Sequence, residues 1–173
     1  MTTWVYLDET KRSGYVIAAA SVTDPVAARR AVRSLILPGQ RRVHMVRERQ
    51  ARKRQIIDAV CALAVTTTIY DAGHHHPSEL AARAACLRAL LADLKEGDTS
   101  LTIEQDDGLV RHDNRWLIEA TRAAGQRDPL RYEHQRASAE PLLAIPDIAA
   151  WAWTKGGEWR RRVEPIIAAV RTV

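Results

Sequence analysis

The strongest constraint on the fold of this chain is the apolar run at residues 4–7, Trp-Val-Tyr-Leu, which ends in the adjacent carboxylates Asp8 and Glu9. Four consecutive apolar residues, rich in aromatic and β-branched types, predict a strand that is buried on both faces. A carboxylate at the end of such a strand lies near the interior, where an unpaired charge is costly, so we expect a cation or a metal beside it. A plainer interpretation is that Asp8 begins a turn, with Asp8 or Glu9 paired to Lys11 or Arg12.

The rest of the chain alternates between predicted strands and helices. A second strand at residues 15–22 follows a polar turn that ends in Gly14, so the first two strands are expected to form a hairpin. Asp24 and Pro25 are residue types typical of a helix N-cap and first turn. Further strands are predicted at residues 41–45, 65–70, 100–103 and 130–135, and helices at residues 25–36, 48–62, 78–95 (ending at Gly97), 114–124, 148–155 and 158–170. This order predicts a single α/β domain, residues 1–173, built on a mixed sheet with flanking helices.

Charge and cysteine content narrow the function classes. The formal net charge is +5 and the pI is near 9.6, which favours a polyanionic partner, nucleic acid (RNA or DNA) first. Cys61 and Cys86 lie in apolar helical contexts without metal-ligand spacing, so we expect reduced thiols in a cytosolic protein. The sequence shows no secretion signal, no membrane span, no Gly-rich phosphate loop, no GxSxG motif and no Cys/His nucleophile pattern.

Three carboxylates occupy the ends of predicted elements. Asp8 ends the first strand, Glu104 ends the strand at residues 100–103, and Asp147 opens the last long helix. The carboxyl ends of strands in an open α/β sheet lie along one edge, where ligand sites form. Gathered carboxylates repel one another unless a divalent cation neutralises them, and oxygen-only ligands suit Mg²⁺ or Mn²⁺. Two such ions could promote phosphodiester hydrolysis.

Each acid also has a purely structural interpretation. Glu104 begins the acidic turn at residues 104–108, and turn acids are commonly solvated. Asp147 follows a proline, and an acid in the first helical turn stabilises the helix dipole without any further role. The argument for a site therefore depends on the joint placement of the three acids.

Residues 5–10 read hydrophobic-Tyr-hydrophobic-Asp-Glu-Thr, and residues 142–150 are centred on Asp147 followed by Ile-Ala-Ala. These two motifs resemble the hydrophobic-Tyr-hydrophobic-Asp-Glu-Ser/Thr strand and the C-terminal Ala-Asp-hydrophobic-hydrophobic-Ala segment of a widespread bacterial family of unknown function that is assigned to the ribonuclease H-like fold. Residues 43–45, followed by a basic helix, also look like the family's middle segment. The resemblance implies that Asp8, Glu104 and Asp147 are the metal-binding acids of a nuclease-like site, with Glu9 or His44 nearby.

The sequence departs from the family pattern in two places. Pro146 and Ala144 stand where the family tends to show Ala and Gln, which affects the expected geometry around Asp147. The middle acid is not part of a sharp motif, so Asp106 or Asp107 could replace Glu104.

Basic residues cluster in two segments. Seven lie between residues 41 and 54 and are opposed by Glu48 alone, which indicates either a solvated helix start or a ridge that contacts phosphates. The seven are Arg41, Arg42, Arg47, Arg49, Arg52, Lys53 and Arg54. In the second segment, Trp159 precedes Arg160, Arg161 and Arg162, and this Trp either stacks on a base or packs the helix onto the core. The loop histidines at residues 74–76 lack the spacing of a zinc site.

These observations predict a metal-dependent nuclease that hydrolyses nucleic-acid phosphodiester bonds. Asp8, Glu104 and Asp147 would hold Mg²⁺ or Mn²⁺, Glu9 would support the site, and His44 would shuttle protons or contact a phosphate. The alternative is a non-catalytic adaptor on the same fold that binds nucleic acid or a protein partner. Dependence on divalent metal separates the two hypotheses; whether the chain forms an oligomer stays open.

Overall fold

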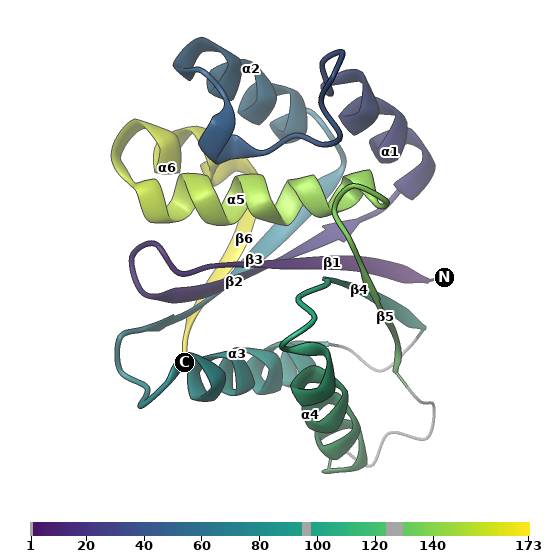
Figure 1. Ribbon diagram of the computed structural model, residues 1–173, viewed down its shortest axis with the longest axis vertical. Coiled ribbons are helices and arrows are strands. Elements are labelled where there is room, and N and C mark those ends of the chain that lie inside the picture. The colour runs from purple at the N-terminus through teal and green to yellow at the C-terminus, as the bar shows by residue number, and fades with distance from the viewer. Residues whose placement is uncertain (1, 95–97, 124–129) are drawn as a thin grey trace.

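A six-stranded mixed sheet forms the centre of the protein. The computed structural model describes residues 2–94, 98–123 and 130–173. The strands follow the spatial order β5-β4-β1-β2-β3-β6 (Figure 1). β1 pairs antiparallel with β2 and parallel with β4, so the sheet is mixed. The strands are β1 (Thr3–Thr10), β2 (Tyr15–Val22), β3 (Val65–Gly73), β4 (Thr99–Glu104), β5 (Arg131–Gln135) and β6 (Ile167–Thr172).

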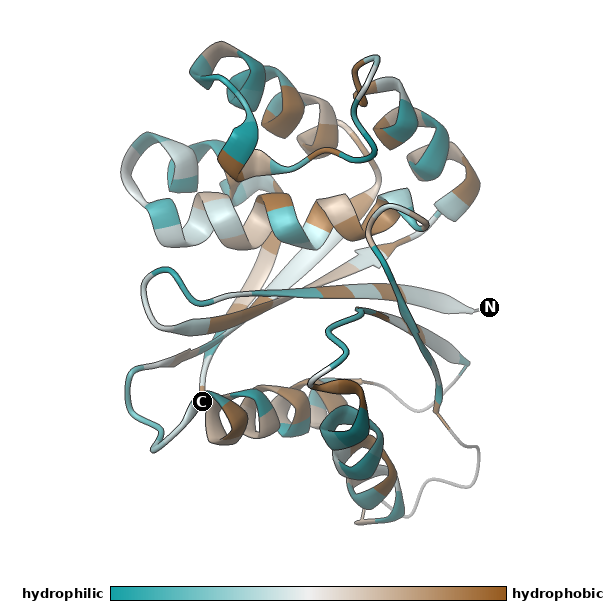
Figure 2. Cartoon of the chain, viewed as in Figure 1, coloured by the Kyte–Doolittle hydropathy of each residue, from teal (hydrophilic) through white to brown (hydrophobic). Residues whose placement is uncertain are grey.

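Helices cover both faces of the sheet. One face carries α1 (Pro25–Ser34), α2 (Gln50–Cys61), α5 (Ala144–Lys155) and α6 (Gly157–Val163), and the other carries α3 (Glu79–Asp93) and α4 (Val110–Ala123) (Figure 1). Short 3₁₀ helices occur at Met45–Arg47, Pro141–Leu143 and Glu164–Ile166. Hydrophobic colour lies on the central strands β1 and β2, whereas the edge strand β5 and much of α4 are hydrophilic (Figure 2).

The sheet separates two hydrophobic cores, and the alternation of β1 assigns its side chains to one or the other. Tyr6 packs in the core under α5, whereas Val5 and Leu7 pack in the core under α3 and α4. Because successive side chains of a strand point to opposite faces, Asp8 continues the Tyr6 face and Glu9 continues the Leu7 face. This alternation determines where the two acids of the dipeptide are directed.

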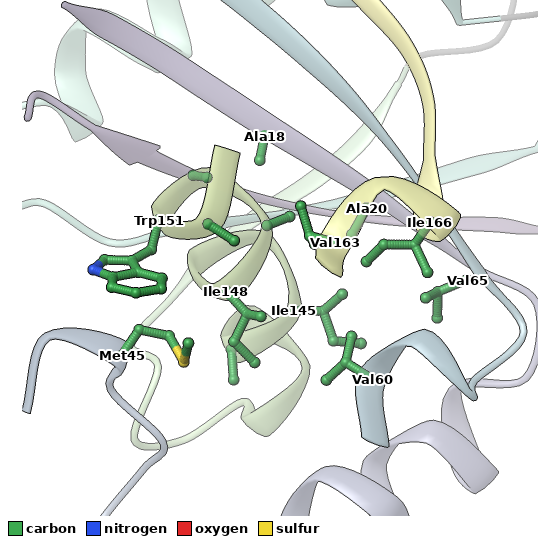
Figure 3. Packing of buried hydrophobic residues seen from close by; sticks show 14 of the residues in the cluster. Ala18, Ala20, Met45, Val60, Val65, Ile145, Ile148, Trp151, Val163 and Ile166 are labelled. Atoms are coloured by element: carbon green, nitrogen blue, oxygen red, sulfur yellow. The ribbon is translucent and has the colours of Figure 1, made fainter. Parts of the chain in front are cut away.

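Helix α5 is buried on nearly all sides and lies directly on β1 and β2. Ala18 and Ala20 of β2 present only methyl groups toward it, which lets the helix approach the sheet closely. On its other side Ile145 and Ile148 lie toward Val60 and Met45 (Figure 3). The packing fixes the first turn of α5, which carries Asp147.

Most predicted elements are confirmed. The hairpin of β1 and β2 is present, Asp24 accepts hydrogen bonds from the amides of Val26 and Ala27 as an N-cap, and β5 is an edge strand. The predicted α/β class with a mixed sheet is correct. The expected helix end at Gly97, and residue 124 at the end of the predicted helix 114–124, lie outside the described residues.

Two predicted elements are wrong. Residues 41–45 form no strand, because Val43 and Met45 instead insert their side chains into the core beneath α5. The predicted helix 158–170 ends at Val163, and β6 follows it along β3. Pro165 disfavours a continuing helix, and the β-branched residues after it suit a strand.

Within the described residues, no helix is long and apolar enough to cross a membrane.

Candidate functional site

The parallel pairing of β1 and β4 brings Asp8 and Glu104 together. Leu7 lies opposite Ile103, so Asp8 and Glu104 are the next residues on their two strands. Side-chain alternation directs both toward the face covered by α5. The carboxyl ends of two parallel strands thus place two acids side by side, as the sequence predicts.

Asp147 reaches the same place from the first turn of α5. Asp8, Glu104 and Asp147 line one cavity of about 450 Å³, which we call the acidic pocket. Its wall also contains Glu9, His44 and Asp106. Residues from four separate parts of the chain therefore converge at one end of the central strands.

The carboxyl group of Asp8 is buried among other negatively charged side chains in this pocket. Burial raises its pKa well above the ordinary value, and a hydrogen bond shared with Glu104 raises it further. The negative charges of Asp147, Glu104 and Glu9 act in the same direction. A carboxyl group in this position gains from a nearby positive charge.

His44 and Asp147 face each other without completing a hydrogen bond. His44 Nδ1 lies 3.6 Å from Asp147 Oδ2, and both atoms are buried and have no hydrogen-bond partner. Buried polar atoms in proteins are nearly always satisfied, so this pair leaves two groups available to a ligand.

The remaining acids near the pocket have other partners. Arg42 donates to Glu104 Oε1 at 3.1 Å. Asp106 accepts a hydrogen bond from the amide of Gly108, and exposed Asp107 pairs with Arg136 at 2.9 Å. Glu104 is thus the acid of this turn that contacts Asp8, whereas Asp107 is engaged at the surface.

Glu9 lies at the wall of the acidic pocket, but its carboxylate points to the other face of the sheet. There Arg83 of α3 donates to it. Arg83 also binds both carboxylate oxygens of Asp113, at 2.6 and 2.8 Å, and the hydroxyl of Tyr15 at 3.1 Å. Glu9 therefore belongs to a buried ionic network behind the three acids.

This network, Glu9–Arg83–Asp113–His134, was missed by the sequence analysis. His134 Nε2 lies 3.0 Å from Asp113 Oδ2. Burial raises the pKa of Asp113, but hydrogen bonds and charges from Arg83 and His134 outweigh burial and hold that pKa below its ordinary value. A signal was present, because Arg83 shares a helix face with Cys86, Leu87 and Leu90.

The predicted basic ridge is only partly available to a ligand. Lys53 is buried, with its ammonium group 4.9 Å from the centre of the Trp151 ring, so it is not available to a phosphate. Half-buried Arg52 donates to the carbonyl of Leu35. Arg54 pairs with Glu158 at 2.7 Å. Arg41, Arg47 and Arg49 are exposed and form no ion pair within the described chain.

The second basic segment, residues 159–162, is also only partly available to a ligand. Trp159 is buried edge-on against Trp151, with ring centres 5.1 Å apart, so it packs the helix onto the core and is not available for a base. Arg160 lies 4.3 Å from the Trp153 ring centre. Arg161 is exposed.

The three acids fit a divalent cation in chemistry, though they are not yet arranged as a ligand set. In residues 2–94, 98–123 and 130–173, no group of three or more His, Cys, Asp or Glu side chains is positioned to hold one ion as it stands. The carboxylate of Glu104 is paired with Arg42, and the carboxylate of Asp147 lies toward His44. The buried Asp8 and the unpartnered oxygen of Asp147 are nevertheless the groups that a hard cation would satisfy.

The mixed sheet, its strand order and the helices on both of its faces form an α/β fold. The chain is similar to the structure of the PCNA:RNase HII complex from Archaeoglobus fulgidus, with a TM-score of 0.61 and 14% sequence identity. The match covers 94% of this chain and 75% of the other. The likeness confirms the predicted fold class. Neither a protein-family model nor a curated protein matches the sequence.

Proposed function

We propose that this protein is a metal-dependent hydrolase of nucleic-acid phosphodiester bonds. The observation that carries the proposal is the convergence of Asp8, Glu104 and Asp147 on one pocket from two strand ends and a helix start. The raised pKa of Asp8 adds support, because crowded carboxylates are stabilised by a cation.

Asp8, Glu104 and Asp147 would hold Mg²⁺ or Mn²⁺. Bound there, the ion would activate water and stabilise the leaving oxygen of a phosphodiester. The buried Nδ1 of His44 has no hydrogen-bond partner, so this ring could hold a proton or contact a phosphate. Glu9 supports the site indirectly, because its bond to Arg83 fixes the strand end that carries Asp8.

Nucleic acid is the partner that the surface charge favours. Arg41, Arg49 and Arg161 are exposed and suited to phosphate contacts, whereas Arg42 and Arg160 already have contacts within the protein. Lys53 and Arg52 instead contact Trp151 and the carbonyl of Leu35 within the protein. Because the similar structure contains an RNase, RNA is the first substrate to test, beside single-stranded DNA and an RNA–DNA hybrid.

The test is cleavage of these three substrates in Mg²⁺ or Mn²⁺ and in chelator. Asp8→Asn and Glu104→Gln keep the side-chain size but remove a ligand charge, so cleavage should fall by about 10²-fold or more. Asp107→Asn is the matched control, since its acid lies at the surface with Arg136 and should keep full activity. If Asp107→Asn loses activity while Glu104→Gln keeps it, Glu104 is not the middle acid of the site.

One observation favours the adaptor alternative: Arg42 already neutralises Glu104, so the pocket is partly balanced by the protein itself. An adaptor would bind nucleic acid equally well in chelator and would cleave none of the three substrates. Metal-dependent cleavage that Asp8→Asn abolishes excludes this alternative.

A further inference from the structure

A second hollow, of about 440 Å³, lies next to the acidic pocket. It is formed by residues 39–48, with Ser138 contributing from a turn after β5. Val43 and Met45 are fully buried in the core under α5, so the segment is anchored even though it is not a strand. Side chains on an anchored segment are held in place for binding. We call this hollow the basic pocket.

The basic pocket has an excess of positive charge. Arg41, Arg42 and Arg47 line it, and Glu48 is its acid. The carboxylate of Glu48 is buried; Gln40 donates to its Oε1 at 3.1 Å, and Arg52 Nε lies 3.9 Å from its Oε2. Arg41 and Arg47 are exposed and form no ion pair with any residue that the structure describes. Planar guanidinium groups without partners match the oxygens of a phosphate.

The basic and acidic pockets are adjacent. His44 lines both of them. Arg42 lines the basic pocket and donates to Glu104 of the acidic pocket. A chain of phosphates lying across His44 would therefore meet carboxylates on one side and arginines on the other.

We propose that the basic pocket binds a backbone phosphate of a nucleic acid whose neighbouring phosphodiester lies at the acidic pocket. This subsite rests on the proposed function, because the acidic pocket gives it its reacting neighbour. Its volume lies within the range of about 300–1,000 Å³ typical of small-ligand pockets, so it suits one nucleotide. Neither Trp nor Tyr is among its lining residues, so it reads the backbone and not the base.

The test measures binding without cleavage. Fluorescein-labelled 12-nucleotide DNA and RNA strands of two sequences are titrated with protein in EDTA, and anisotropy is followed over a range of salt. The pocket variant is Arg41→Ala/Arg47→Ala. Its control, Arg88→Ala/Arg122→Ala, removes the same charge from exposed positions on α3 and α4, on the opposite face of the sheet (Figure 1). Melting curves verify that both variants are folded.

We expect the pocket variant to raise Kd about tenfold or more for every strand, because each arginine loses a charged hydrogen bond. The log–log salt slope should flatten by about 0.7, the value for one lost phosphate contact on a single strand. The control should change Kd less than twofold. Equal effects of the two variants would overturn the subsite and leave only general attraction by charge.

Inorganic phosphate provides a second arm. If inorganic phosphate displaces the strands from the parent protein but not from the pocket variant, the pocket binds both free phosphate and backbone phosphate, as proposed. If it binds the parent while strand binding is unaffected by the pocket variant, the pocket is a free-phosphate site and the proposal is wrong.

The outcome is independent of hydrolysis. Should Asp8→Asn abolish cleavage while the pocket variant behaves like its control, the subsite fails and the hydrolase function stands. Should the pocket variant weaken binding while Asp8→Asn leaves cleavage unchanged, the acidic pocket is not the reacting site and the hydrolase proposal fails.

Discussion

Arg83→Met tests the claim that a buried ionic network supports the strand end that carries the acidic pocket. The Arg83 side chain is 2% exposed and that of its partner Asp113 is 1% exposed. Methionine keeps the aliphatic volume but leaves Asp113 with His134 alone and Glu9 without its cation. Removing one partner of a buried pair costs about 3–5 kcal/mol. In a chain of this size that free energy corresponds to a fall in Tm of about 6–20 °C.

The control is Arg115→Met on α4, where Arg115 is 60% exposed and lies 4.0 Å from Glu119. An exposed pair contributes about 0–1 kcal/mol, so Tm should fall by less than about 4 °C. Calorimetry or circular dichroism at pH 7 measures both variants. A further variant, Arg83→Met/Asp113→Leu, removes both charges of the pair and should be more stable than Arg83→Met alone. If Arg83→Met shifts Tm no more than Arg115→Met, the network does not stabilise the fold and the reasoning is refuted.

Two further predictions concern the acidic pocket. Because the pKa of Asp8 is raised in the folded protein, its contribution to stability is complete below about pH 4 and is lost as pH rises through the folded pKa. In EDTA, Asp8→Asn should therefore melt higher than the parent at pH 7–8 and lose this advantage toward pH 4; a lower Tm at pH 7 would contradict the crowding of charges. Mg²⁺ at a hundredfold excess over its Kd should stabilise the parent by about 2.7 kcal/mol, raising Tm by about 5–11 °C. Asp147→Asn should lack most of that rise, and an equal rise in this variant would remove Asp147 from the ligand set.

The three acids could be predicted from the sequence because their placement follows from local rules. A buried strand ends where its apolar run ends, so Asp8 and Glu104 were located at strand ends without knowing the fold. Their approach needed only that the two strands be parallel neighbours, as the order of an α/β sheet suggests. Asp147 was expected in the first turn of α5, and the turn is present.

The features that were missed depend on long-range packing. Residues 41–45 alternate like a strand, but their apolar side chains pack under α5, which is distant in sequence. The availability of the basic residues likewise depends on tertiary partners: Lys53 meets Trp151, and Arg54 meets Glu158. The number of charges along the chain does not show which basic residues are paired within the fold and which, like Arg41 and Arg47, stay exposed.

The Asp8–Glu9 dipeptide joins two opposite electrostatic environments through one strand. Alternation directs Asp8 into a pocket of like charges, which destabilises the folded state without a cation. The same alternation directs Glu9 into the network of Arg83, where every acid has a cation and the pKa of Asp113 is lowered. Since the two side chains share a backbone, the stable network on one face holds the strand end that presents the strained carboxylate on the other. The cation site that we propose at Asp8 needs such support close behind it, and the support begins one residue away.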